Sequence, residues 1–514
     1  YLEVNTKENR YTAGFASTLR VCGSDKNIEL RRKASALGDK VVQTVEINGK
    51  QGKAYTIEKY VAVSTSRDTS KDSVQKSADD ELASFINRGM DDEFKNSIDN
   101  LDKMWSVSNI CISGDEKAQK AIRFNIYLML SSVNPDDEKV SLGAKGLHGE
   151  GYNGHVFWDN EIFNLPFYIY SNPKAARSML LYRYNTLDAA RENARAGGYR
   201  GARYPWESAD TGREETPRWG LDYKGNPVRI WTGDIEYHIT SDIVYAILQY
   251  VRATGDMDFL LNYGAEITFE TSRFWASRVE YNRESDRYEI NDVIGPDEFH
   301  EHINNNVFTN YMARWNMQRG IELFSMIKDL YPEHYGRLSK KLNLTRDEVE
   351  GWKGIASKIF FPHQNDDLVF EQFEGYFNLK DYVVTEYDDV NNMPVFPRGI
   401  DRVKLNDYTL IKQADIVMLL YILGEEFSLK TKKNNFEYYE RRTMHKSSLS
   451  PSIYCILGLV VGNYKKSYEY LMRTAMVDLD DNQGNTSRGV HMASTGGTWQ
   501  AAVFGFGGVS INSE

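Results

Sequence analysis

Residues 291–306 carry the residue types that acid–base chemistry needs, in a polar loop between two stretches of helical periodicity. A Gly-Pro turn precedes Asp297 and Glu298, and Phe299 follows them directly. A general acid needs a carboxyl group whose apolar or anionic neighbours keep it protonated near neutral pH. The loop therefore predicts a general acid, although its composition alone is also typical of a solvated acidic loop.

The same loop allows a metal-binding interpretation. His300 and His302 lie two residues apart, so that both imidazoles would point to one side of an extended strand. This pattern is weak without a remote third ligand, which His238, His445 or His491 would have to supply. We therefore expect no metal and keep the metal site as an alternative.

Two tryptophans precede a carboxylate directly, Trp158 before Asp159 and Trp206 before Glu207. A hexose is commonly held by stacking on an aromatic ring and by hydrogen bonds from its hydroxyls to carboxylates. Chance pairs of this kind are common in a chain with 9 Trp, and an Asp at a helix start is often only a cap. The repeated pairing indicates a sugar site.

Polar residues stand at the predicted starts of three apolar helices. Lys412 and Gln413 begin a predicted helix over residues 409–424, where they need solvent or polar partners. His491 is followed by small residues and a Gly-Gly turn before a predicted helix over residues 496–506, and Ser447 and Ser448 precede another. Backbone N–H groups and hydroxyls at such a helix start can hold an anion, although serines there are usually only caps.

Read together, these segments resemble the glycoside hydrolase family 65 phosphorylases, over about residues 105–510 and in the same order. The stretch Gly-Pro-Asp-Glu-Phe-His at 295–300 is similar to the general-acid motif of that family, which implies Glu298 as the catalytic acid. The loop around Trp206 and the residues after the acid resemble members that act on α-1,2 linkages, in kojibiose or glucosylglycerol.

The resemblance implies a mechanism and a set of site residues. Phosphate would attack C1 of a glucosyl unit while the acid protonates the departing oxygen, which gives inversion and β-glucose 1-phosphate. No cofactor or metal is implied, because inorganic phosphate is a co-substrate. The implied substrate-binding residues are Trp158, Asp159, Trp206, Glu207, Thr232, Lys412 and Gln413, and the implied phosphate-binding residues are Ser447, Ser448 and His491.

Two other functions stay open at this point. The first is an inverting α-glucoside hydrolase of the acid trehalase type, which would need a second carboxylate about 6.5–9.5 Å from the acid to activate water. The second is a sugar-binding protein without turnover. A phosphorylase that acts on maltose, nigerose or trehalose is the alternative within the family.

Composition limits the partners and the compartment. The formal charge of −11 disfavours nucleic acid, and no apolar run reaches the roughly 18 residues of a membrane helix. Three distant cysteines predict no disulfide framework, which favours a reducing cytoplasm. The expected partners are therefore a small carbohydrate and phosphate, and the resemblance implies a homodimer for the full-length protein.

The elements that would position these residues are mostly helical. Residues 1–66 predict antiparallel strands with a hairpin at Asn48-Gly49, which the resemblance makes the C-terminal part of an N-terminal β-sandwich. Residues 67–112 predict a helical linker. From 113 to 508 twelve candidate helices predict a six-hairpin toroid, an (α/α)6 barrel, and residues 509–514 would begin a truncated C-terminal β domain.

Overall fold

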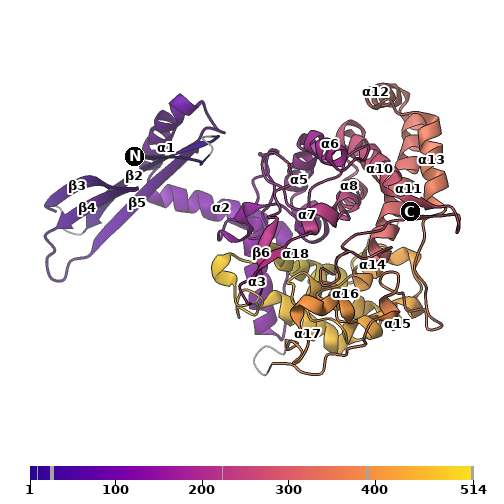
Figure 1. Cartoon of the computed structure of the whole chain (residues 1–514). Helices are drawn as coiled ribbons and strands as arrows, with labels where there is room; N and C mark the ends of the chain where they lie inside the picture. Colours follow the sequence, from indigo (N-terminus) through magenta and orange to yellow (C-terminus); the bar gives the residue numbers. More distant parts are fainter. Residues whose placement is uncertain (8–9, 24–27, 223, 389–392, 511–514) are drawn as a thin grey trace. The chain divides into compact units, whose positions relative to one another are not determined.

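The computed structural model describes residues 1–514 except 8–9, 24–27, 223, 389–392 and 511–514. Most of the predicted start of a C-terminal domain at 509–514 therefore lies outside the described residues. The chain divides into two units, Tyr1–Val107 and Ser108–Glu514 (Figure 1). Within the described ranges, no helix is both long and apolar enough to cross a membrane.

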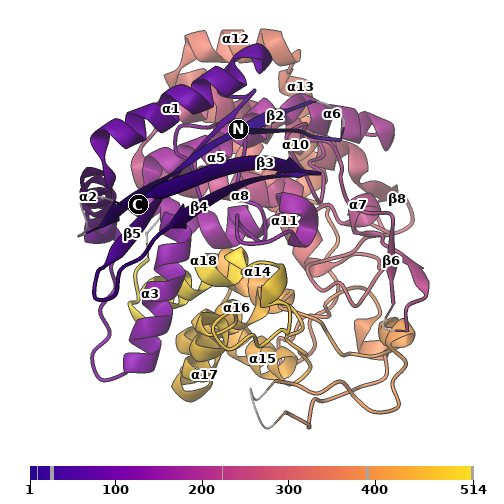
Figure 2. The same ribbon diagram turned by 90° about the vertical axis from the view of Figure 1, so that its left-hand side faces the viewer.

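The first unit is a small antiparallel sheet backed by a helix. Strand β2 (Thr12–Gly23) pairs with β1 (Leu2–Asn5) on one side and β5 (Tyr55–Thr65) on the other. Helix α1 (Val74–Arg88) packs against β2 and β5, as Figure 2 shows, and helix α2 (Met90–Ser108) follows it.

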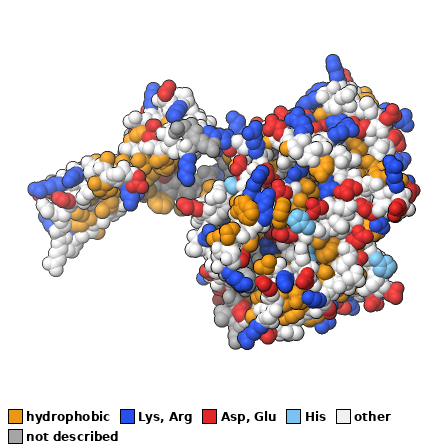
Figure 3. All heavy atoms as spheres, in the orientation of Figure 1, with side chains coloured by type: hydrophobic (Ala, Val, Ile, Leu, Met, Phe, Trp, Pro, Cys, Tyr) orange, Lys and Arg blue, Asp and Glu red, His pale blue; other side chains and the backbone are white. Residues whose placement is uncertain are grey.

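The two faces of β5 differ in exposure. Tyr60 and Ala62 are buried, whereas the alternate Val61 and Val63 are 45% and 55% exposed. This period of two is the signature of a strand with one covered face. Hydrophobic side chains accordingly gather on the surface of this unit in Figure 3.

The predicted hairpin at Asn48-Gly49 is wrong. Strand β4 (Lys40–Ile47) pairs with β3 (Leu30–Leu37), and β5 pairs with β2 instead. The Asn-Gly pair lies in the connection between the two sheets, because β5 matches the long β2 over its whole length and buries alternate side chains against α1.

The second unit is a helical barrel in which helices adjacent in sequence pack as pairs, such as α10 with α11 and α16 with α17. Its longer helices are α3 (Glu116–Leu130), α5 (Pro173–Asn185), α6 (Leu187–Ala196), α8 (Ile239–Thr254), α10 (Ala265–Arg278), α11 (Val307–Leu330), α12 (Pro332–Leu342), α13 (Arg346–Ala356), α15 (Leu429–Glu440), α16 (Ser450–Val460) and α17 (Tyr464–Ala475). Its shorter helices are α4 (Leu165–Ser171), α7 (Thr232–Ile235), α9 (Met257–Phe259), α14 (Ile416–Ile422) and α18 (Met492–Gln500).

The last helix of the barrel closes it against the first ones. Helix α18 packs on α3, on α4 and on the π-helical segment Asp159–Asn164. Gln500 donates from Nε2 to the carbonyl oxygens of Ile162 and Phe163, both at 2.8 Å. Asn125 in α3 donates to the carbonyl oxygen of Ala475 at 2.9 Å.

Two predicted helix starts are wrong. Residues 409–415 are not helical: Ile411 is bridged to Thr443, several of its neighbours form bends, and α14 begins only at Ile416. Gly496 and Gly497 do not form a turn before a helix but lie buried inside α18. A Cβ on Gly496 would come within 2.3 Å of the carbonyl oxygen of Phe163, so this glycine permits close helix packing.

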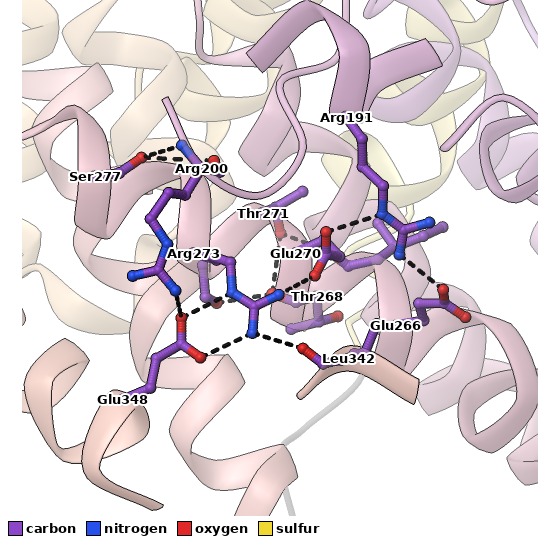
Figure 4. Close-up of polar contacts among 12 residues, drawn as sticks. Arg191, Arg200, Glu266, Thr268, Glu270, Thr271, Arg273, Ser277, Leu342 and Glu348 are labelled. Carbon is purple, nitrogen blue, oxygen red and sulfur yellow. Dashed lines mark hydrogen bonds and ion pairs between the residues drawn. The ribbon is translucent and has the colours of Figure 1, made fainter. Parts of the chain in front are cut away.

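Ion pairs tie three outer helices together (Figure 4). Arg191 of α6 contacts Glu266 and Glu270 of α10 at 2.8 and 2.9 Å. Arg273, also of α10, contacts Glu348 of α13 at 2.7 Å. Because these pairs form a connected network, they fix the outer helices more firmly than isolated surface pairs would.

Candidate active site

A cavity of about 440 Å³ lies within the second unit and is lined by every residue that the sequence assigned to the site. These residues come from segments more than 300 positions apart in the chain. The set comprises Trp158, Asp159, Trp206, Glu207, Thr232, Glu298, Lys412, Gln413, Ser447, Ser448 and His491. The structure therefore brings them together, and their individual roles stay predictions.

The acid loop buries one of its two adjacent carboxylates and leaves the other in the cavity. Asp297 is fully buried and accepts hydrogen bonds from the backbone N–H of Lys412 at 2.7 Å, from Nε2 of Gln372 at 3.0 Å and from His300 at 2.6 Å. Glu298 faces the cavity with 27% of its side chain exposed. Asp297 thus anchors the loop, whereas the side chain of Glu298 lies at the surface of the cavity.

Lys412 is the direct partner of Glu298. Its Nζ donates to Oε1 of Glu298 at 2.8 Å. Burial lowers the pKa of Lys412, but the charge of Glu298 and the hydrogen bond to it outweigh burial and raise that pKa. Gln413 donates to the carbonyl oxygen of Pro296, and its own buried Oε1 has no hydrogen-bond partner among the described residues.

Aromatic rings and a carboxyl group form one wall of the cavity. Trp158 and Trp206 lie with ring centroids 6.3 Å apart, and Phe157 contacts Trp206 edge-on at 6.3 Å. Asp159 is 7% exposed. Burial, reinforced by the charges of Glu161 and Glu298, raises the pKa of Asp159 to about 7. This carboxyl group can therefore donate as well as accept near neutral pH.

Glu207 is fixed by a histidine. Its Oε2 lies 2.8 Å from Nδ1 of His155. Burial raises the pKa of Glu207, and the hydrogen bond to Glu207 raises the pKa of His155. Nearby, Glu214 accepts from the backbone N–H of Trp206 at 2.8 Å, which holds this loop in place.

A buried lysine that the sequence analysis missed lies beside His491. Lys145 is 3% exposed, and its Nζ lies 2.9 Å from Nε2 of His491. Asp478 holds His491 from behind, 2.7 Å from its Nδ1. Lys145 lines the same cavity as Ser447 and Ser448. Together these groups form a cationic and hydroxyl-bearing region, which suits an oxyanion such as phosphate.

Both units of the chain match the domains of one known family. The glycosyl hydrolase family 65 central catalytic domain matches residues 123–500, and the N-terminal domain of the same family matches residues 1–104. The chain belongs to glycosyl hydrolase family 65.

Individual members of family 65 are similar over the whole chain. The kojibiose phosphorylases of Caldanaerobacter subterraneus subsp. tengcongensis and Thermoanaerobacter brockii are each 55% identical over 518 residues, which cover 100% of this chain and 67% of those proteins. The solved structure of a candidate kojibiose phosphorylase from the human microbiome has a TM-score of 0.84 and 29% identity, covering 100% of this chain and 65% of that one. The chain thus spans about two thirds of the length of these relatives.

The family 65 chain has a second, larger cavity of about 1030 Å³ that shares Glu298, Glu301 and Arg229 with the first. The hairpin of β6 (Trp219–Leu221) and β7 (Pro227–Arg229) contributes to its wall, and the sequence analysis did not predict this hairpin. The two cavities therefore meet at Glu298.

The alternative metal site receives no support from the geometry of this family 65 chain. His300 lies 2.6 Å from Asp297 and 2.8 Å from the carbonyl oxygen of Tyr408, whereas His302 lies 2.6 Å from Asp292. Among the described residues, no group of three or more His, Cys, Asp or Glu could hold a metal ion.

Proposed function

We propose that the chain cleaves an α-1,2-glucosidic bond of the kojibiose type with inorganic phosphate, as an inverting phosphorylase. The observation that carries the proposal is the pairing, in one cavity, of Glu298 with the Lys145–His491 group. The named relatives support the same activity, because both curated proteins at 55% identity are kojibiose phosphorylases.

In the proposed reaction Glu298 protonates the glycosidic oxygen as the C1–O bond breaks, and a phosphate oxygen forms the new bond to C1 from the opposite face. The product is β-glucose 1-phosphate, the released acceptor keeps the proton from Glu298, and the proton that hydrogen phosphate loses on forming the ester restores the acid. Lys145, Ser447, Ser448 and His491 would hold the phosphate, so no carboxylate is needed to activate a nucleophile. No cofactor takes part in this reaction, because inorganic phosphate is a second substrate and is consumed.

A hydrolase is the second candidate, because Asp159 and Glu207 also line the cavity. Either is a candidate for the base that activates water. Burial raises the pKa of Asp159 to about 7, near the value that suits a general base, and His155 orients Glu207. The phosphate requirement separates the two functions.

The first test is Glu298→Gln. The amide keeps the shape of the side chain but cannot donate the proton, so we expect phosphorolysis of kojibiose to fall by about 10² to 10⁴ while sugar binding persists. Product formation is followed with and without phosphate, and NMR assigns the anomer of the glucose phosphate. Glu301→Gln, which alters another carboxylate of the same cavity, is the matched control. Equal rates in Glu298→Gln and the unaltered chain would remove Glu298 from the acid role.

The second test concerns the linkage. Trp206, Glu207 and Thr232 would contact the acceptor, and a site built to pair one set of hydroxyls rejects a sugar that leaves its buried groups unpaired. We expect kojibiose or 2-O-α-glucosylglycerol to be cleaved at least about tenfold more efficiently than maltose, which corresponds to about 1.4 kcal/mol. Rates on kojibiose, glucosylglycerol, nigerose, trehalose and maltose at saturating phosphate decide this, and a preference for maltose or trehalose contradicts it.

A further inference from the structure

A histidine clamped between two carboxylates lies directly beneath the aromatic wall of the cavity. His238 is fully buried, with Nδ1 2.7 Å from Oδ2 of Asp242 and Nε2 3.2 Å from Oε1 of Glu236. Glu236 is 1% exposed and Asp242 is fully buried. Neither His238 nor its two partners line either cavity that reaches Glu298, so their place in the site is indirect.

Both ring nitrogens of His238 are held by hydrogen bonds to carboxyl groups. A neutral histidine can donate to only one of them, so the three groups share their protons, and burial raises the pKa of Glu236 well above its usual value and also raises the pKa of Asp242. Burial opposes the charge, but the attraction of Asp242 and the hydrogen bonds to Asp242 and Glu236 raise the pKa of His238 to about 10. The ring is therefore held at both nitrogens and cannot turn without leaving a buried carboxylate unpaired.

The fixed ring touches both tryptophans of the cavity wall. Its centroid lies 4.6 Å from that of Trp158 and 5.3 Å from that of Trp206, both nearly edge-on, and 5.2 Å from Phe308. Rings at these centroid distances prefer such edge-to-face arrangements, which hold their planes relative to one another. His238 is thus a common support for two rings that come from loops 48 residues apart.

The same group of residues adjoins the acid loop. The carbonyl oxygen of Ile235, next to Glu236, accepts a hydrogen bond from the backbone N–H of Ile294 at 3.1 Å. Glu236 also interacts electrostatically with Glu298 and Lys412, and its Oε2 is buried without a hydrogen-bond partner. The clamp formed by Glu236, His238 and Asp242 therefore connects the wall formed by Trp158 and Trp206 to the loop that carries Glu298.

We infer that His238, held between Glu236 and Asp242, is a positioning residue that fixes the planes of Trp158, which faces the glucosyl unit, and of Trp206, which faces the acceptor. The inference rests on the proposed function for its substrate. The stacked wall holds the sugar equally in the ground state and in the transition state. Loosening it therefore weakens binding more than it slows the chemical step.

The test uses His238→Gln in the full chain. Gln donates to the two carboxylates less well and has no ring, so we expect the KM for kojibiose to rise about tenfold while kcat changes less than about threefold. Tryptophan emission rises as well, because a protonated imidazole quenches an adjacent indole. Asp242→Asn keeps the ring and the shape but removes one clamping charge, and it shifts KM and emission in the same direction by less.

His445→Gln is the matched control. His445 is also buried and packs against aromatic rings, with Nδ1 3.0 Å from the hydroxyl of Ser450 and Nε2 3.1 Å from the hydroxyl of Tyr470. Among the described residues, however, it contacts tyrosines and no carboxylate. We expect it to leave tryptophan emission and the KM for kojibiose unchanged. A merely structural role of His238 would instead lower kcat through the loss of folded protein while KM stays constant.

The outcomes for the two proposals are distinct. If the unaltered chain shows no phosphate-dependent cleavage, the proposed function fails, and the emission change together with kojibiose binding still tests the clamp. If the unaltered chain is active and both His238→Gln and Asp242→Asn keep its KM and its emission, the inference about His238 is overturned.

Discussion

Replacement of Asp415 by Asn is expected to change how the stability of the barrel depends on pH. Asp415 is fully buried behind the acid loop, where its Oδ2 accepts from the backbone N–H of Asp297 at 3.3 Å and from Nδ2 of Asn306 at 3.1 Å. Its Oδ1 has no hydrogen-bond partner. Burial, together with the charge of Asp297, raises the pKa of Asp415 from 3.8 to about 7.

Proton binding to Asp415 decides whether the free energy of unfolding rises or falls with pH. Between about pH 4 and pH 7 the folded chain keeps a proton on Asp415 that the unfolded chain has lost. The free energy of unfolding therefore falls as the pH rises through this window. The difference between 3.8 and about 7 corresponds to about 4 kcal/mol in total, of which roughly 2–3 kcal/mol falls between pH 5 and pH 8. Asn has no proton to lose, so the variant escapes this decline.

Urea unfolding at pH 5 and pH 8 measures the effect. Tryptophan emission reports mainly on the barrel, because eight of the nine tryptophans, all but Trp105, belong to the second unit. We expect Asp415→Asn to gain roughly 2–3 kcal/mol relative to the unaltered chain on going from pH 5 to pH 8. Asp366→Asn, at an exposed position, is the control and shows no such gain. A constant difference between Asp415→Asn and the unaltered chain would refute the assignment of a buried, protonated carboxyl group.

Two further variants test the site and the interior. Lys145→Met is expected to raise the KM for phosphate at least about tenfold with little change in the KM for kojibiose, because a charged donor to the anion is lost. Initial rates at varied phosphate measure this, with Lys139→Met at an exposed position as the control. Equal KM values for phosphate in Lys145→Met and the unaltered chain would exclude Lys145 from the phosphate site. Glu161→Gln is expected to lower the free energy of unfolding by about 3–5 kcal/mol, because Arg183, bonded to Glu161 at 2.8 and 3.0 Å and 1% exposed, stays buried without its counter-charge. Urea unfolding measures the second effect against Glu192→Gln at an exposed ion pair, and a loss no larger than that of the control would contradict it.

Local patterns predicted most of the longer helices and the acid loop, whereas the full set of site residues came from the resemblance to family 65. Periodic apolar positions marked most longer helices but not α12, and the Gly-Pro turn before Asp297 and Glu298 marked the acid loop. The comparisons confirm the family on independent grounds.

The remaining features depend on contacts between distant segments. Lys145 has an ordinary local sequence, and only its contact with His491, 346 residues away, identifies it. The predicted helix start at Lys412 failed because the bridge from Ile411 to Thr443 keeps this segment out of a helix. The two glycines of α18 looked like a turn, since the close approach of Phe163 to Gly496 is invisible in the sequence.

The closure of the barrel by α18 has a consequence for the order of events as the polypeptide is synthesised. The contacts of Gln500 with Ile162 and Phe163 join residues more than 330 positions apart, so they form only after nearly the whole barrel sequence has been translated. Contacts of such high sequence separation form slowly, because a long loop has to close first. Lys145 and His491 meet across the same junction. The anion region of the cavity therefore cannot form in a nascent chain until α18 has left the ribosome.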